Sequence, residues 1–238
     1  MGIFADIVKE VRLDLNDSVG GAGQLWGDDE LTKYGNEGQN EIARRAYAII
    51  DYSTASVCQV TMLTNQAAYT KDSSILLIDS VLGSDSEPLQ KRTEEWLDVN
   101  NIGWRTASAG KPQYFVEKKS ALWLVPKPSS TYNGLKVYLT VRRLPLKPVS
   151  ITGTPAVDPE ISSTYYEDLK NWMKYRAYMK QDAQTLNEKK AAEYLQLFNA
   201  SIGDRTSANI ERIIQEETPN SMCMAPVRPG TGLYYGNR

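Results

Sequence analysis

Residues 25–45 read LWGDDELTKYGNEGQNEIARR, and their pattern predicts one helix over residues 28–50 that packs closely against another helix. The three acids at positions 28–30 suit the positive end of a helix dipole. Gly35 and Gly38 each cost about 1 kcal/mol relative to alanine inside a helix, which indicates that another backbone approaches closely there. The stripe that faces the core has the three-and-four spacing of an amphipathic helix and comprises Leu31, Tyr34, Gly38, Ile42, Ala46 and Ile49.

Other segments of the chain have the same helical periodicity. Apolar residues between Ile3 and Leu15 predict a first helix, so that residues 1–56 supply the N-terminal helices of a bundle. The pattern returns between Tyr165 and Ala177, and again between Ala191 and Ile202. A short helix is expected through Ile210, Ile213 and Ile214, and residues 151–217 therefore supply the C-terminal helices.

Residues 57–150 have the alternation of β-strands instead and predict an inserted, small antiparallel β subdomain. In the last predicted strand, Leu135, Val137, Leu139 and Val141 share one face. Pro88 is expected to open one short helix over about residues 88–100, because proline is tolerated in a first helical turn. The strands are expected at Ile75–Ile78, Gln113–Glu117, Ala121–Val125 and Leu135–Arg143.

Two proline-rich segments complete the layout. Four prolines between Leu144 and Pro159 predict a stiff connector. Residues 218–238 contain three prolines and three glycines, which favour an extended C-terminal arm. The fold class expected from the sequence is α+β: a mostly helical bundle with an inserted small antiparallel β subdomain and an extended arm. The arm residues expected to contact a neighbour are Arg228, Leu233, Tyr234, Tyr235 and Arg238.

The composition excludes several classes of protein. The 238 residues include no histidine, which rules out histidine-assisted nucleophiles and every histidine-ligated zinc site. The formal net charge is −2, so the chain is not expected to coat a polyanion. Cys58 and Cys223 have no cysteine close by and are interpreted as a buried thiol and an incidental one. We expect no cofactor and no metal.

The chain also lacks the patterns of secretion and membrane insertion. An acid stands at Asp6 and no basic segment precedes it, so the first residues do not resemble a secretory signal. No apolar run approaches the ~20 residues that span a bilayer. The sequence therefore predicts a protein that folds in a cytoplasm and has no membrane partner.

Two local patterns could support chemistry. The glycines at positions 20–23 suggest a phosphate loop, but no Gly-Lys-Ser/Thr follows them, and a flexible loop is the simpler interpretation. Glu37 and Glu41 lie four residues apart on one helical face and could act as paired carboxylates. Arg45 follows Glu41 by four residues, however, and an ion pair between them is the simpler expectation.

The helix motif, together with two later stretches, resembles the head-to-tail adaptor (connector) proteins of tailed bacteriophages. The first stretch runs over residues 122–128 and continues through 135–145; the second spans residues 165–182 and the later residues 191–194. The resemblance thus covers about residues 3–203. The motif residues that carry it are Trp26, Asp28, Glu30, Leu31, Tyr34, Asn36, Glu37, Gly38, Glu41 and Arg44.

The resemblance implies a structural protein of the virion rather than an enzyme. Such adaptors assemble in the host cytoplasm into a homo-oligomeric ring, here expected to hold twelve copies, at the head–tail interface. The ring docks on the portal protein, extends the channel for double-stranded DNA without binding it specifically, and offers a platform to a tail or nozzle protein.

Two other functions are consistent with parts of the sequence. One is a virus-borne, carboxylate-based hydrolase of glycans or cell walls, which would use Glu37 and Glu41. The other is a β-type module that binds sugars or proteins through residues 105–145. A fragment of that length buries little core by itself, which weighs against the second alternative.

Overall fold

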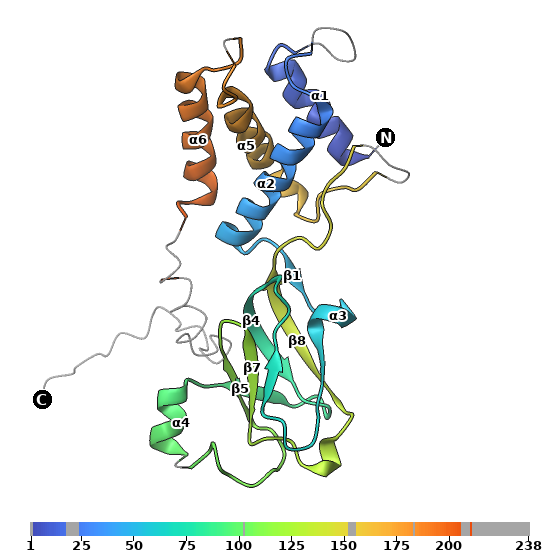
Figure 1. Cartoon of the computed structure of the whole chain (residues 1–238), viewed down its shortest axis with the longest axis vertical. Coiled ribbons are helices and arrows are strands. Elements are labelled where there is room, and N and C mark those ends of the chain that lie inside the picture. Colours follow the sequence, from blue (N-terminus) through green and yellow to red (C-terminus); the bar gives the residue numbers. More distant parts are fainter. Residues whose placement is uncertain are drawn as a thin grey trace, which may run out of the picture.

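The computed structural model divides the chain into two lobes arranged end to end (Figure 1). It describes residues 2–17, 24–101, 103–151, 156–182, 184–205 and 210. The helical lobe lies at one end and contains both the first and the last helices. The β lobe lies at the other end and is formed by the middle of the chain. Within the described residues, no helix is long and apolar enough to cross a membrane.

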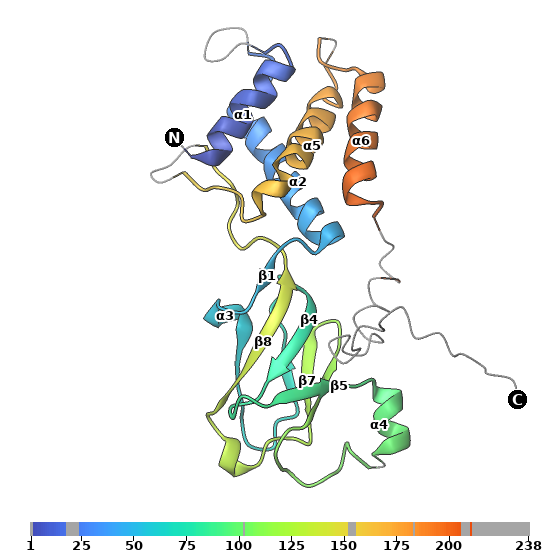
Figure 2. The ribbon, with the colours of Figure 1, turned by 180° about the vertical axis from the view of Figure 1, so that it is seen from behind.

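Among the described residues, four helices form the helical lobe. They are α1 (Ile3–Asp14), α2 (Asp28–Ala46), α5 (Tyr166–Tyr178) and α6 (Glu188–Ile202). α5 is the central helix and packs against each of the other three. Seen from behind, α1 and α6 lie on opposite sides of α5 (Figure 2). The bundle is therefore built by segments from both ends of the chain.

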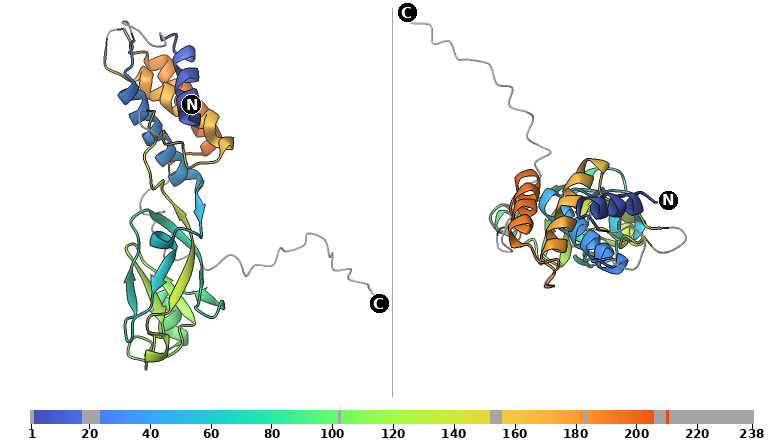
Figure 3. Two further views of the ribbon diagram at one scale, coloured as in Figure 1. Left: turned by 90° about the vertical axis from the view of Figure 1, so that its right-hand side faces the viewer. Right: turned by 90° about the horizontal axis from the view of Figure 1, so that it is seen from above.

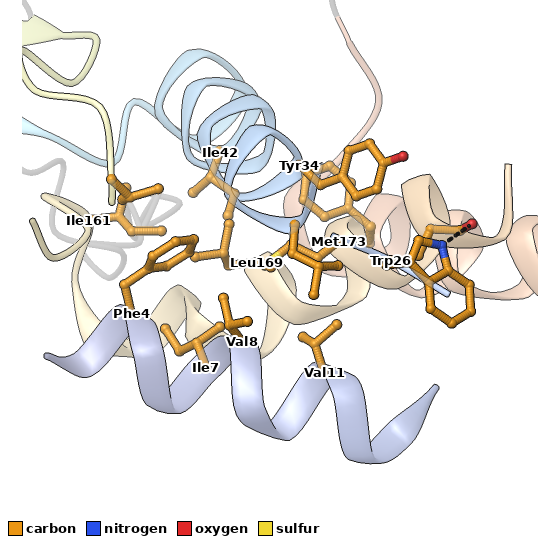
Figure 4. Close-up of a cluster of buried hydrophobic side chains, with 14 of the residues drawn as sticks. Phe4, Ile7, Val8, Val11, Trp26, Tyr34, Ile42, Ile161, Leu169 and Met173 are labelled. Atoms are coloured by element: carbon orange, nitrogen blue, oxygen red, sulfur yellow. Dashed lines mark hydrogen bonds between the residues drawn. The ribbon is translucent and has the colours of Figure 1, made fainter. Parts of the chain in front are cut away.

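A continuous apolar core joins these helices. α1 contributes Phe4, Val8 and Val11, which point toward Leu169 and Met173 of α5 (Figure 4). Trp26, just before α2, is buried, and its indole Nε1 donates a hydrogen bond of 3.0 Å to the carbonyl of Ala177. Its ring also meets Tyr178 edge-on, with the centroids 6.4 Å apart. These contacts attach the start of α2 to the end of α5.

The two glycines of α2 lie where neighbouring side chains come closest. A Cβ atom at Gly35 would lie 2.5 Å from Cζ of Phe4. One at Gly38 would lie 2.7 Å from Cδ1 of Leu169 and 2.9 Å from Cδ1 of Trp172. The predicted close packing of this face against another helix is confirmed, although side chains of α1 and α5 make the approach rather than bare backbone. The helix ends at Ala46, before the predicted residue 50, because Tyr47 adopts a left-handed conformation with φ of 49°.

The β lobe is one curled sheet of eight strands. Along its main path the strand order is β1-β8-β4-β5-β6-β7-β3, and β2 pairs with β8 beside β1. The β5–β6 pair is parallel, and the other pairs are antiparallel. The strands are β1 (Ile50–Asp51), β2 (Gln59–Thr61), β3 (Ala68–Thr70), β4 (Ile75–Leu82), β5 (Pro88–Lys91), β6 (Tyr114–Glu117), β7 (Ala121–Val125) and β8 (Lys136–Arg143).

An ion cluster lies inside the sheet. The carboxylate of Glu117 is fully buried and accepts hydrogen bonds from the ammonium groups of Lys71 at 3.0 Å and Lys91 at 2.8 Å. The backbone N–H of Ile78 donates to the same carboxylate. Removing Glu117 would leave two buried ammonium groups without this partner, which costs several kcal/mol in comparable sites. The cluster therefore fixes β4, β5, β6 and the residue that follows β3 relative to one another.

Two short helices accompany the sheet: α3 (Ala55–Cys58) and α4 (Glu94–Asn100). α4 covers one face of β6 and β7 with a small core that contains Leu97, Trp104 and Val125. Thr93 caps this helix by accepting a hydrogen bond from the N–H of Trp96. Two single 3₁₀ turns occur at Ser130–Tyr132 and Ser163–Tyr165.

The expectation of a mostly helical bundle with a small antiparallel insert is wrong. Of the described residues, 40% are helical and 21% lie in strands, and the sheet forms a lobe of its own. The predicted helix over residues 88–100 fails for a local reason: Pro88–Lys91 alternates between exposed and buried residues and forms β5. Proline is also tolerated as the first residue of a strand. Helix α4 begins only at Glu94 and belongs to the crossover that makes β5 and β6 parallel.

The fold predicts that Gly38→Leu destabilises the helical lobe. Leucine would force Leu169 and Trp172 apart, and overpacking of this kind costs roughly 1–3 kcal/mol. Lys33→Leu, on an exposed position of the same helix, is the matched control. Chemical denaturation of both variants measures the difference, and equal unfolding free energies for the two would contradict the prediction.

Candidate interaction surface

Every motif residue of the sequence lies on α2 or immediately before it, and together they contact α1, α5 and the proline-rich connector. Trp26, Leu31, Tyr34 and Gly38 are buried in the core. The polar members bind side chains and backbone of other segments. The apolar motif residues therefore serve the packing of the helical lobe.

Asn36 attaches the proline-rich connector to α2. Its side-chain oxygen accepts a hydrogen bond of 2.8 Å from the N–H of Val149, and its Nδ2 donates one of 3.2 Å to the carbonyl of the same residue. Gln39, one turn further on, donates to the carbonyl of Lys147. The side-chain amides of Asn36 and Gln39 thus bind backbone groups of the connector. The sequence motif alone does not identify these partners. Gln39 was absent from the predicted set.

The acids at the start of α2 bind cations from two other segments. Asp28 accepts a hydrogen bond of 2.6 Å from Arg12 of α1. Arg12 is buried, pairs also with Asp17, and donates to the carbonyl of Trp26 at 2.9 Å. Glu30 accepts hydrogen bonds of 2.9 Å from the N–H of Gly27 and from Lys180. These charges fasten α1 and the end of α5 to the start of α2.

Glu37 and Glu41 form one wall of an open groove on the α6 side of α2. Glu37 lies 2.9 Å from Nε of Arg176, and Glu41 lies 3.0 Å from Nε of Arg45. Arg44 and Arg205 approach Glu41 at 3.7 and 3.8 Å. We call this site the arginine groove. It has a volume of about 380 Å³ and is lined by Glu37, Asn40, Glu41, Arg45, Trp172, Arg176 and Arg205.

Arg45 is both a wall of the groove and a support for α6. Its guanidinium donates to the side chain of Asn199 at 2.8 Å and to the carbonyl of Gly203 at 3.1 Å. It also lies over the rings of Trp172 and Phe198. Because arginines hold both carboxylates of the groove, the geometry does not favour Glu37 and Glu41 as an acid–base pair for hydrolysis.

A second charged cluster holds the two lobes together. Arg143, at the end of β8, donates a hydrogen bond of 2.6 Å to Asp51 and one of 2.6 Å to Glu160. The other oxygen of Glu160 accepts the backbone N–H groups of Leu146 and Lys147, both at 2.8 Å. The chain crosses between the lobes twice, and Arg143 links both crossings. It binds Asp51 beside the first crossing and Glu160, which in turn binds Leu146 and Lys147 of the second.

The Asp51 carboxyl has a strongly perturbed pKa. Burial raises the pKa, but hydrogen bonds from Thr54, Ser53 and Arg143 outweigh burial and hold the pKa well below its usual range. Nearby, burial and the Asp51 charge raise the pKa of the Cys58 thiol to about 11. Cys58 is buried, as expected, and stays protonated at neutral pH. Among the described residues, no group of three acids or cysteines could hold a metal ion.

Residues 105–145 do not form a separate binding module. They contain β6, β7 and β8, but β8 pairs with β4 and β1, and β6 pairs with β5. The hypothesis of an independent sugar- or protein-binding β module therefore has no support in the topology.

Several predicted features lie outside the described residues. They include the glycine cluster at positions 20–23, Ile213 and Ile214 of the short predicted helix, Cys223 and the whole arm over residues 218–238. The contact residues predicted for the arm lie there too: Arg228, Leu233, Tyr234, Tyr235 and Arg238.

Comparison with known families gave a match over nearly the whole chain. The family model described as SU10 adaptor protein matches residues 3–229. The match covers both lobes and every motif residue of α2, and it extends into the predicted arm. Comparison with curated proteins gave no match.

The low pKa of Asp51 predicts acid sensitivity at the junction of the lobes. Its folded pKa lies below the unfolded value of about 4, so its contribution to stability is complete above that value and is lost as pH falls toward the folded pKa. The difference in unfolding free energy between the wild type and Asp51→Asn should therefore shrink as the solution is acidified below about pH 4. Denaturation at several pH values measures it, with the exposed Asp29→Asn as control. A difference that stays constant with pH would refute the assignment.

Proposed function

The chain belongs to the SU10 adaptor protein family, and from that membership we propose that it is a head-to-tail adaptor in the virion of a tailed bacteriophage. In this proposal twelve copies form a ring that docks on the portal protein, extends the DNA channel and provides the attachment platform for a tail or nozzle protein. The observation that carries the proposal is the family match, which leaves out only the first two and the last nine residues.

The shape of the chain supports this function. An adaptor must contact one partner at each end, and the two lobes lie at opposite ends of an elongated subunit (Figure 3). The Arg143 cluster holds the lobes together through buried ion pairs. A subunit of this form can hold the portal and a tail component at a fixed distance from each other.

The proposed role is structural, without catalysis, cofactor or metal. Glu37 and Glu41, the strongest catalytic candidates of the sequence, are engaged by Arg176 and Arg45. The net charge of −2 per chain suits a channel that DNA must slide through, since twelve copies would sum to about −24 and repel phosphates.

We further propose that residues 218–238 act as an arm that reaches a neighbouring subunit or the portal. Free solvated tails are usually depleted in apolar and aromatic residues, and this segment contains many of them. Arg228 and Arg238 add planar donors that suit acidic grooves or backbone carbonyls. The apolar members are Met222, Met224, Val227, Leu233, Tyr234 and Tyr235.

The ring proposal predicts that the protein binds portal and assembles on it. Size-exclusion chromatography with light scattering, with and without purified portal, should give a complex that contains many copies of the 26.6 kDa chain. Heterologous contacts that close into a ring fix one copy number, so the added mass should saturate. A protein that stays monomeric and does not bind portal would contradict the proposal.

The arm proposal predicts a separation between folding and assembly. Deletion of residues 219–238 should leave the melting temperature nearly unchanged, because described residues supply all three hydrophobic cores. The same deletion should weaken association with the ring or with portal, measured by light scattering against the full chain. If the truncated chain assembles on portal as tightly as the full chain, the arm is not the anchor.

A further inference from the structure

The two sides of the helical lobe carry different surfaces. Seen from above, α6 and α1 lie at opposite sides of the lobe, with α5 between them (Figure 3). The arginine groove lies on the α6 side, where Arg45 contacts Asn199 and Arg205 follows the helix. The outer face of α1 forms the other side.

The arginine groove has an excess of positive charge. Three guanidinium groups, of Arg45, Arg176 and Arg205, line it against the two carboxylates of Glu37 and Glu41. Arg44, beside the lining, adds a fourth positive charge that pairs with Glu41 at 3.7 Å. Arg205 and Arg176 remain partly exposed. Trp172 lines the groove, and its buried indole N–H has no hydrogen-bond acceptor in the part of the chain that the structure describes. The groove can therefore accept a partner that brings carboxylates and apolar surface.

The outer face of α1 has those two properties. Ile3, Asp6, Glu10 and Leu13 follow the spacing of three and four residues that places side chains on one face of a helix. The two apolar side chains at its ends are exposed, Ile3 at 48% and Leu13 at 60%. Glu10 pairs with Lys170, but the carboxylate is the exposed partner and the lysine is mostly covered. The face thus presents acids to solvent between two apolar residues.

We propose that the arginine groove of one copy receives the outer face of α1 from a second copy. The inference rests on the proposed ring, because a contact between two different surfaces on opposite sides of a subunit is heterologous, and such a contact builds a ring when the rotation between copies closes. The partner is a second copy rather than nucleic acid, since α1 supplies both the carboxylates that complement the arginines and the exposed apolar side chains that such a contact would cover. Figure 1 shows α1 and α6 on opposite sides of the helical lobe, with the β lobe at one end.

Charge reversal on each surface tests the pairing. The face variant combines Asp6→Lys with Glu10→Lys, and the groove variant combines Arg44→Glu with Arg205→Glu. Each keeps one native surface, and neither changes Arg45 or Arg176, which lie over the core rings of Trp172 and Tyr34. Like charges would then meet, and assembly of either variant alone, measured by light scattering with portal present, should weaken by about tenfold or more.

The decisive sample is the equimolar mixture of the two variants. Lysines on the face of one chain would meet glutamates in the groove of the other, and the unchanged surfaces would meet as in the wild type. The mixture should therefore assemble again. A control with Lys119→Glu and Lys189→Glu, at exposed positions outside both surfaces, should assemble like the wild type. Thermal melting checks that each variant is folded.

Each other outcome has a defined meaning. If either variant assembles as tightly as the wild type, its surface is not part of the contact and the inference is overturned. If both fail and the mixture fails too, the surfaces meet something else, such as portal, the arm or DNA, and the inference is again overturned. If the wild type itself never assembles, the proposed ring fails, which separates that failure from an error in the pairing of surfaces.

Discussion

The helical lobe depends on the close approach of its neighbours to α2 at two glycines. Side chains on α1 and α5 occupy the space where Cβ atoms of Gly35 and Gly38 would stand. The cost of glycine in a helix, about 1 kcal/mol at each position, is offset by the apolar contacts that it permits. Because α1 and α5 pack this close to α2, Asn36, which lies between the two glycines, can reach the proline-rich connector. There it binds both the N–H and the carbonyl of Val149.

The same helix links packing to the proposed function. Its carboxylates pair with arginines, and the arginines in turn support α6 and leave a surplus of positive charge in an open groove. The motif therefore builds the lobe and shapes one of its outer surfaces with the same residues. The Arg143 cluster then fixes the β lobe to this unit, so that surfaces at both ends of the subunit keep a defined spacing.

The sequence predicted what local periodicity can show. The span of β7 was predicted as observed, and α1, α2, α5 and α6 lie where the apolar spacing placed them, because each pattern is set by near neighbours in the chain. The size of the sheet and the parallel β5–β6 pair were missed, because strand pairing across long separations leaves no local signal. The site divides in the same way. Glu41 and Arg45 pair as expected at a spacing of four. Asn36 and Val149 are 113 positions apart, and Arg143 is 92 positions from Asp51 and 17 from Glu160, and no spacing rule identifies these partners.

The central claim is that this chain forms a ring between portal and tail, and electron microscopy of the purified assembly tests it most directly. The account predicts a closed ring with an open central channel, seated on the portal, in which the helical lobes of neighbouring copies lie side by side. Each copy should span the ring wall with its β lobe at one end and its helical lobe at the other. Isolated subunits, open filaments or a ring that leaves the portal unoccupied would contradict the account.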